Sequence, residues 1–295
     1  MSLSDDVRRG CAAIAAQARF VTIDLDALDA LAPGPAPELD PERHYLDGSP
    51  QDVATYIVVL DTINFGSGWF PTLTKRVSAD GSPVSGYFTV AWALADRFRA
   101  HGPWTNAQLR AMSTEEVATV LGQPTDHELM ALYAQALRAL GAFLGDRHPL
   151  DVVAHAGSSA VALAALLADG MAMFHDAGFF KRAQITPSDL ELARKARFGD
   201  LDRLTIFADN LVPHVLRCEG VLVYDERLAA HIDAGRVLPM GPQEREIRAC
   251  ALHACAVLAQ RRGLTERDID NALWARGQTP AYKARPRHRC RCVYY

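Results

Sequence analysis

A carboxylate, an amide and several aromatic rings lie close together in one stretch of the sequence, LDTINFGSGWF (residues 60–70). Asp61, Asn64 and Phe65 are spaced i, i+3 and i+4, so on a helix they would share one face. The two glycines that follow allow a tight turn and a close approach of the backbone to a ligand. The stretch could therefore bind a planar ring, or it could be an ordinary helix end closed by a hydrophobic plug.

A second carboxylate, Asp209, lies in the largely apolar segment LTIFADNLVPHVL (residues 204–216). An unpaired charge in such surroundings is costly, so the side chain needs a partner or a function. Pro213 would kink or break a helix here, because it cannot donate a hydrogen bond to the Asp209 carbonyl. A carboxylate at a helix irregularity is typical of a catalytic acid, and a buried structural Asp is the alternative.

Three further segments carry charged residues. FFKRAQI (residues 179–185) places Lys181 and Arg182 beside aromatic residues, where they could reach a phosphate or extend along the surface. GPQEREIR (residues 241–248) has charges at helical spacing, a pattern that most often forms exposed ion pairs. Residues 271–295 contain six Lys and Arg residues and no acid, so they form either a phosphate-binding feature or a solvated basic tail.

The overall composition favours a small-molecule substrate over a nucleic-acid polymer. The 295 residues are 49% hydrophobic and 22% charged, a balance that excludes disordered, collagen-like and disulfide-scaffold proteins. Polymer-binding proteins usually have a basic surface, whereas this chain has a net charge of −4. The sequence has no uninterrupted apolar run of about 18 residues and begins with a polar segment, so we expect no membrane association and a cytoplasmic location.

The cysteines predict neither a disulfide framework nor a metal site. Six are scattered along the chain, and reduced thiols are the default in the cytoplasm. His288, Cys290 and Cys292 could contribute zinc ligands, but no second pair has the spacing of a structural zinc site. We therefore expect no bound metal, with zinc at this cluster as the alternative.

Residues that typically start or end helices are easy to identify in the sequence. A Ser or Thr cap followed by proline or an acid predicts five helix starts, at Ser49, Ser113, Thr125, Thr186 and Thr265. The helix after Ser113 should end at Gly122. Apolar periodicity predicts further helices over residues 158–174 and 247–258, and we expect another within residues 1–19.

Strand signals are few. Residues 20–25 alternate weakly, and residues 287–295 alternate strongly, with Arg287, Arg289 and Arg291 on one face and the cysteines on the other. The sequence therefore predicts a mainly α protein with small β additions, including a C-terminal strand. We expect one compact domain over residues 1–295, with an extended connector over residues 32–48.

Five ordered blocks resemble a known family, the queuosine salvage proteins: LDTINFGSGWF, FFKRAQI, IFADNLVPHVL, GPQEREIRACAL and HRCRCVYY. The resemblance runs from about residue 20 to residue 295 and implies a single compact fold similar to the helical DNA glycosylases. It implies hydrolysis of the N-glycosidic bond of queuosine 5′-monophosphate, and less well of the nucleoside, releasing queuine for reinsertion into tRNA. It also implies that no cofactor is needed, and we expect a monomer.

The resemblance further implies roles for individual residues. Queuine is a 7-deazaguanine and has no N7 to protonate, so its departure relies on charge stabilisation. Asp209, beside the anomeric carbon, would stabilise an oxocarbenium-like transition state, attack it or activate water. The implied substrate-binding residues are Asp61 and Asn64 at the base, Phe65 or Trp69 stacking on it, Lys181, Arg289 and Tyr295 at the phosphate, and Asn210.

Two alternatives remain at this point. The chain could be a helical glycosylase for DNA or for another nucleoside base, in which case it would extrude a base from a duplex. It could also be a nucleotide-binding module without catalysis.

Overall fold

Most helices begin at a capping side chain in this computed structural model, which describes residues 2–35 and 37–295. Three predicted starts are confirmed, because the hydroxyls of Ser49, Ser113 and Thr265 accept hydrogen bonds from backbone N–H groups three residues ahead. Gly122 ends its helix in the left-handed conformation, with φ of 62°, as predicted.

The described residues form fifteen α-helices and two strands, and the mainly α class is confirmed. The α-helices are α1 (Leu3–Ala16), α2 (Leu25–Ala30), α3 (Pro50–Thr62), α4 (Gly86–His101), α5 (Asn106–Arg110), α6 (Thr114–Leu121), α7 (Glu128–Leu144), α8 (Pro149–His155), α9 (Ala160–Gly170), α10 (Lys181–Leu192), α11 (Val212–Cys218), α12 (Glu226–Asp233), α13 (Pro242–Arg262), α14 (Glu266–Gly277) and α15 (Pro280–Lys283). Three 3₁₀ turns are η1 (Phe70–Thr72), η2 (Ala172–Phe174) and η3 (Leu201–Arg203). Strands β1 (Val21–Ile23) and β2 (Leu222–Tyr224) pair antiparallel, with Thr22 opposite Val223, and β1 confirms the weak strand signal at residues 20–25.

Two predicted helix starts are wrong. Helix α7 begins at Glu128 rather than after Thr125, and the ring of His127 accepts the hydrogen bond of the Leu129 N–H. Helix α10 begins at Lys181, so Pro187 lies inside it. The Thr186 hydroxyl donates back to the Arg182 carbonyl instead of capping a new helix. Packing of α10 against α3 and α9 overrides the local signal, and Lys181 and Asp189 consequently share one helix.

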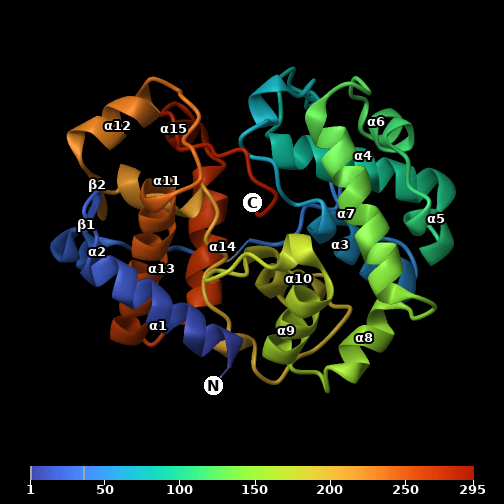
Figure 1. The fold of residues 1–295 in the computed structure, drawn as a ribbon, viewed down its shortest axis with the longest axis horizontal. Coiled ribbons are helices and arrows are strands. Elements are labelled where there is room, and N and C mark those ends of the chain that lie inside the picture. Colours follow the sequence, from blue (N-terminus) through green and yellow to red (C-terminus); the bar gives the residue numbers. More distant parts are fainter. Residues whose placement is uncertain (1, 36) are drawn as a thin grey trace.

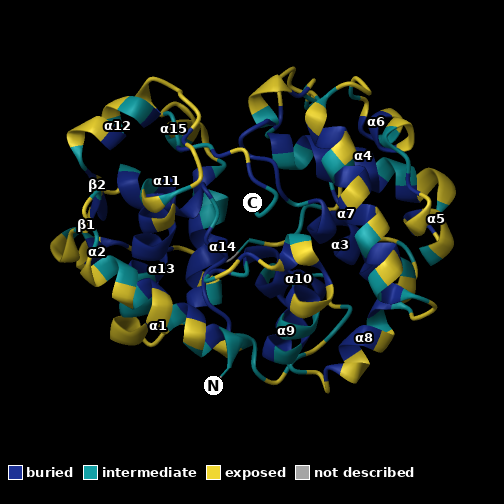
Figure 2. Cartoon of the chain, in the orientation of Figure 1, coloured by how far each residue is buried: buried dark blue, intermediate teal, exposed yellow. Residues whose placement is uncertain are grey.

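The helices gather around two main apolar cores. The larger core contains side chains of α3, α4, α6, α7, α9 and α10, and the second contains side chains of α1, α11, α13 and α14 with both strands. Figure 1 shows these two groups of helices on opposite sides, with α9 and α10 between them and residue 295 near the centre. The faces turned toward the cores are buried, whereas the outer faces are exposed (Figure 2).

Residues 287–295 do not form the predicted strand. Their backbone has no regular element and bends at residue 293, and it bonds to loops: the Leu238 N–H donates to the Arg289 carbonyl over 2.7 Å, and Gly66 and Ser67 donate to the Tyr295 oxygen. The burial alternation survives, since His288, Cys290 and Cys292 are buried. The alternation holds through Cys292 and then fails, because Tyr295 is buried whereas Tyr294, expected on the cysteine face, is only half-buried. Periodicity therefore predicts most of the faces and does not predict the lack of a sheet.

The expected connector over residues 32–48 contains no helix or strand in its described part, and residue 36 lies outside the described residues. Within residues 2–35 and 37–295, no single helix has the length and apolarity to cross a membrane. Helices α8 and α9 together meet those criteria, but the chain bends by 118° between them. The likeness to DNA glycosylases stays a prediction.

Candidate active site

A cavity of about 320 Å³ lies where elements of the two cores meet. This volume is within the range of small-molecule sites. Its wall comes from the turn after α3, from α4, α10 and α14, from the loop before α11 and from residues 287–295. The charged residues that line it are Glu38, Asp40, Arg43, Lys181, Asp189, Asp209, Asp270 and Arg287.

Asp209 lies at the cavity surface in the loop that leads into α11. One of its carboxylate oxygens accepts hydrogen bonds from the Leu211 N–H over 2.7 Å and from the Val212 N–H over 3.1 Å. Pro213 is the second residue of α11, so it starts this helix and does not kink it. The carboxylate is therefore fixed by two N–H donors that favour its charge, while the side chain remains only half-buried.

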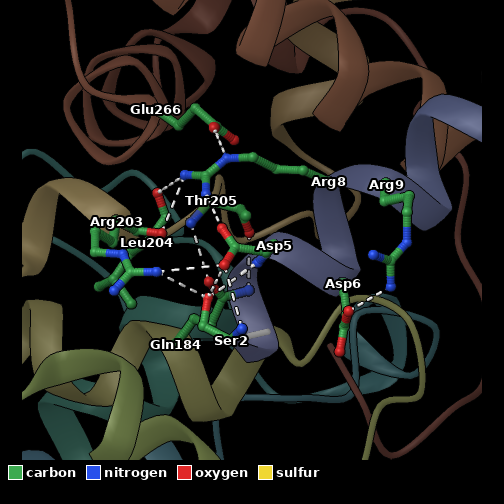
Figure 3. A network of polar contacts seen from close by, with 10 residues as sticks. All are labelled: Ser2, Asp5, Asp6, Arg8, Arg9, Gln184, Arg203, Leu204, Thr205 and Glu266. Carbon is green, nitrogen blue, oxygen red and sulfur yellow. Dashed lines mark hydrogen bonds and ion pairs between the residues drawn. The ribbon is translucent and has the colours of Figure 1, made fainter.

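The segment that carries Asp209 is fixed by side chains from several helices. The buried amide of Gln184 on α10 donates to the Thr205 hydroxyl and accepts from the Thr205 N–H, at 2.8 and 3.0 Å. Arg8 of α1 donates to the Leu204 carbonyl and pairs with Glu266 of α14, within the network drawn in Figure 3. These contacts limit the freedom of the loop just before the candidate catalytic residue.

Asp270 of α14 fixes the next part of the same loop. Its carboxyl accepts the Phe207 N–H over 2.8 Å. Burial raises the pKa of Asp270 well above its usual value, and the charge of Asp209 raises it further. Asp270 therefore favours its neutral form beside Asp209.

Asp61 is completely buried behind the cavity wall, on the last turn of α3, and is not among the residues that line the cavity. Neither of its oxygens accepts a hydrogen bond from a donor in the described part of the chain. Burial and the neighbouring Asp189 raise the pKa of Asp61 well above its usual value. Burial also raises the pKa of Asp189 to about 6. Burial and the neighbouring carboxyl favour the neutral form of Asp61, and a protonated Asp61 would donate to Asp189.

Asp189 therefore reaches the cavity where the sequence predicted Asp61 to do so. Sequence reasoning missed Asp189, because its surroundings, Thr-Pro-Ser-Asp, have the composition of a helix cap. Asp270 was also missed, since Thr265-x-x-Asp268 accounts for the acids at the start of α14. Both are recognisable only once α3, α10 and α14 are seen together.

Lys181, the first residue of α10, lines the cavity as predicted for a substrate-binding residue. Its ammonium donates to the Asn64 carbonyl over 3.1 Å and is only 4% exposed at the residue level. Burial lowers the pKa of Lys181, whereas Asp209, Asp61 and Asp189 oppose that shift. The lysine thus links the candidate catalytic carboxylate with the acid pair.

Four other predicted residues also line the cavity, namely Asn64, Phe65, Asn210 and Tyr295. Asn64 and Phe65 lie beyond the end of α3, so they reach the site from a turn and not from a helical face. Phe65 packs edge-to-face on Tyr133 with ring centroids 5.0 Å apart. The Asn210 amide donates to the His288 carbonyl over 3.0 Å. This bond connects the C-terminal tail (residues 287–295) to the loop that carries Asp209.

Trp69 and Arg289 are not among the lining residues, whereas Tyr295 is. Trp69 is buried beneath the tail and donates to Glu128 over 2.7 Å, with Arg291 over its ring. Arg287 lines the cavity in the position predicted for Arg289. The alternation of the tail explains this, since both arginines share a face and only side-chain direction selects between them.

Arg287 makes no ion pair with any residue in the described ranges. Lys75 and Arg289 lie close enough to Arg287 for their charges to affect one another. Arg287 is therefore a cation at the cavity without a direct ion pair in this part of the chain, although the charge of Asp209 acts on it. The other cations there are Lys181, which is surrounded by acids, and Arg43, which pairs with Asp40. An anionic group on a ligand would be attracted to this side.

Aromatic rings close another part of the cavity. Trp274 of α14 meets Tyr87 of α4 edge-to-face, with ring centroids 5.3 Å apart, and Phe88 at 5.9 Å. All three rings line the cavity and connect the two groups of helices. The sequence did not predict this cluster, because its members lie on helices far apart in the chain.

No group of three or more His, Cys, Asp and Glu side chains within residues 2–35 and 37–295 is arranged to hold a metal ion. The side chains of His288, Cys290 and Cys292, within the tail itself, are buried, and the cysteines are free thiols. The expected lack of a metal or organic cofactor stays a prediction.

Comparison with known proteins gives one consistent result. Residues 43–295 match the model of the family described as queuosine salvage protein. A protein of Sphaerobacter thermophilus named queuosine 5′-phosphate N-glycosylase/hydrolase is 33% identical, covering 95% of this chain and 94% of its own length. Proteins of the same name from Mus musculus (28% identical; 84% and 83% covered) and Schizosaccharomyces pombe (26%; 99% and 96% covered) are also similar.

Proposed function

This chain belongs to the queuosine salvage protein family, and we infer from that membership that it is an N-glycosyl hydrolase acting on queuosine 5′-phosphate. The reaction adds water across the bond between the base and C1′ of the ribose. Its products are queuine, which becomes available for tRNA modification, and ribose 5-phosphate.

One observation carries the assignment of the chemistry, namely the position of Asp209. It is a carboxylate held by two backbone N–H groups, half-buried at a cavity of suitable size, with Asp270 favouring its neutral form nearby. A fixed negative charge beside C1′ stabilises the positive charge that develops on the ribose as the base leaves. We assign this role to Asp209.

The base-side contacts follow from the remaining groups. The guanine-like edge offers two N–H donors, which a carboxylate accepts. Asp189 reaches the cavity and holds a hydrogen bond from Asp61, so we assign the acceptor role to Asp189 and a supporting role to Asp61. Asn64 and Phe65 also line the cavity, and Phe65 is almost fully buried, with Arg182 over its ring.

We assign the 5′-phosphate to the side of the cavity formed by Arg287 and Tyr295. Arg287 forms no ion pair within the described residues. The Tyr295 hydroxyl is buried and has no hydrogen-bond partner among them. Both groups are therefore free to bind phosphate oxygens. Lys181 lies between this side and the acids, where it would contact the ribose phosphate while balancing the charge of Asp209.

The finer properties of the protein are also proposals. We propose that residues 1–295 act as one domain, that the protein is a cytoplasmic monomer and that it needs neither metal nor organic cofactor. The chain's net charge of −4 supports a mononucleotide substrate over a nucleic-acid polymer.

The test is a chromatographic assay of queuosine 5′-phosphate incubated with the purified chain. Stoichiometric queuine and ribose 5-phosphate are expected, and the unphosphorylated nucleoside should react more slowly. Tight binding of the substrate without release of the base would instead identify a non-catalytic module. Base release from duplex DNA at low salt, without release from queuosine 5′-phosphate, would identify a DNA glycosylase.

A further inference from the structure

Arg248 of α13 is one of the most deeply buried charged residues of the described chain, with 1% of its surface exposed. The spacing of charges in residues 241–248 predicted exposed ion pairs, and this prediction is wrong, since Glu244 and Glu246 are buried as well. Burying a guanidinium is costly unless its donors are satisfied. The partners of Arg248 therefore indicate what the burial achieves.

The guanidinium of Arg248 donates in three directions. Its Nε donates to the Ala208 carbonyl over 2.8 Å, and Nη1 donates to Asp176 over 3.1 Å and to Glu244 over 3.3 Å. Nη2 donates to the second oxygen of Asp176. All of its nitrogens are thus used, and the arrangement holds the plane of the guanidinium in one orientation.

Two aromatic rings pack against this guanidinium. The Phe179 ring centroid lies 3.9 Å from the central carbon of Arg248, and that of Tyr295 lies 4.6 Å from it. A planar cation can satisfy in-plane donors and out-of-plane rings together, which an ammonium group cannot.

Three of these partners, Ala208, Asp176 and Tyr295, lead directly to a group at the cavity. Ala208 immediately precedes Asp209 in the sequence. Asp176 accepts the Lys181 N–H over 3.4 Å, at the point where α10 begins. Tyr295 lines the cavity itself. Arg248 does not line the cavity, so it contacts no substrate there.

We propose that Arg248 is a positioning residue that sets Asp209, Lys181 and Tyr295 relative to one another. The bond to the Ala208 carbonyl fixes the peptide plane from which Asp209 extends, while Asp176 and Tyr295 are held by the same group. Because one guanidinium serves all three segments, losing its geometry moves the catalytic carboxylate relative to the bound ribose. The consequence for turnover rests on the proposed function, whereas the positioning itself does not.

The test compares Arg248→Lys with a matched control, Arg217→Lys. Arg217 is also buried, donates twice to one carboxylate, Asp233, at 2.9 and 2.8 Å, and lies over a tyrosine ring at 4.9 Å, but it does not line the cavity. We expect R248K to lower kcat for queuosine 5′-phosphate by about 30- to 100-fold with KM changed only a few-fold. R217K should keep kcat while losing a similar amount of thermal stability.

A second measurement does not depend on activity. Amide hydrogen exchange of residues 207–212 should be at least about tenfold faster in R248K than in the wild type, and unchanged there in R217K. Equal protection in both variants would overturn the proposal, as would a kcat of R248K equal to that of R217K. A wild type that releases no queuine would refute the proposed function and leave the exchange result to decide the positioning.

If R248K does not fold, Asp176→Asn provides the second variant. It keeps Arg248 and the size of the Asp176 side chain, but it removes one charge and replaces one of the two acceptor oxygens with an N–H donor. The same pattern is expected with smaller amplitude, namely reduced kcat, little change in KM and faster exchange at residues 207–212. Wild-type kcat and protection in D176N would contradict the proposal.

Discussion

The Gly66 N–H donates to the main-chain oxygen of Tyr295 over 2.9 Å, so the turn after α3 and the tail form one continuous wall. Gly66 has φ of 105°, and a Cβ there would lie 2.7 Å from Leu129. A Cβ on Gly68 would lie 2.4 Å from the Cys290 carbonyl oxygen. The sequence predicted that these two glycines let the backbone approach a ligand. In the structure they instead let it approach residues 287–295.

Asp209→Asn should abolish base release while leaving the fold and ligand affinity largely intact. The amide keeps the shape but loses the charge that stabilises the ribose cation. We expect kcat to fall by about 10²- to 10⁴-fold, measured by chromatography of released queuine.

Asp225→Asn is the matched control for this variant. Asp225 accepts N–H groups two and three residues ahead, at 2.9 and 3.1 Å, as Asp209 does, but it lies outside the cavity. D225N should therefore share any stability loss of D209N and keep wild-type kcat. Wild-type turnover by D209N would remove Asp209 from the mechanism.

Arg287→Ala should reduce kcat/KM for queuosine 5′-phosphate by about 10- to 100-fold, because it removes an unpaired cation from the phosphate side. The same variant should lose little on the nucleoside. Arg285→Ala, an exposed residue of the same tail, is the control and should behave as the wild type. Equal losses on both substrates would place the phosphate elsewhere.

Lys181→Met should give a different pattern from R287A. Lys181 faces Asp209, Asp61 and Asp189, so losing its charge leaves these acids uncompensated whichever substrate is bound. We therefore expect a loss of at least about tenfold in kcat on both substrates. A loss confined to the phosphorylated substrate would instead make Lys181 its principal phosphate ligand.

Asp61→Asn should be tolerated, since the amide can donate to Asp189 as the protonated carboxyl does. Burial and Asp189 raise the pKa of Asp61, so the neutral substitute matches the native state. We expect unfolding free energy within about 1 kcal/mol of the wild type and turnover within about tenfold. Asp61→Ala, which removes the donor, should lose about 2 kcal/mol or more in urea unfolding. A drop in kcat of D61N as large as that of D209N would show that an ionised Asp61 is needed.

His288 should make the protein less stable in acid. Burial lowers the pKa of His288 to about 3, with the charge of Arg248 as the next cause. The folded state resists a proton that the unfolded chain accepts near pH 6.5, so stability falls as the pH drops below about 6.5. At pH 5 the loss is about 2 kcal/mol.

The measurement for this prediction is thermal unfolding between pH 4.5 and 8. His288→Gln cannot titrate and should flatten the decline, whereas the exposed His101→Gln should leave it unchanged. A parallel decline in H288Q and the wild type would assign the acid sensitivity to other groups.

Sequence reasoning succeeded where a local signal has one physical meaning. Asp209 stands out because a charge in an apolar run needs a purpose, and capping hydroxyls set most helix starts correctly. It failed where the direction of a side chain, or the residue that it contacts, depends on tertiary packing. Trp69 points toward Glu128, and Asp189 on α10 lines the cavity. Pro187 lies inside the same helix. Local residue spacing specifies none of these three arrangements.

The tail's contacts have a consequence for how the molecule folds. Helices form from neighbours in the chain, whereas the bonds of Asn210 to His288 and of Gly66 to Tyr295 join distant residues and carry a larger loop-closure entropy. The cavity wall should therefore assemble after the helices. A refolding sample should regain its helical circular dichroism before it regains turnover, and catalytic recovery would report the completion of folding.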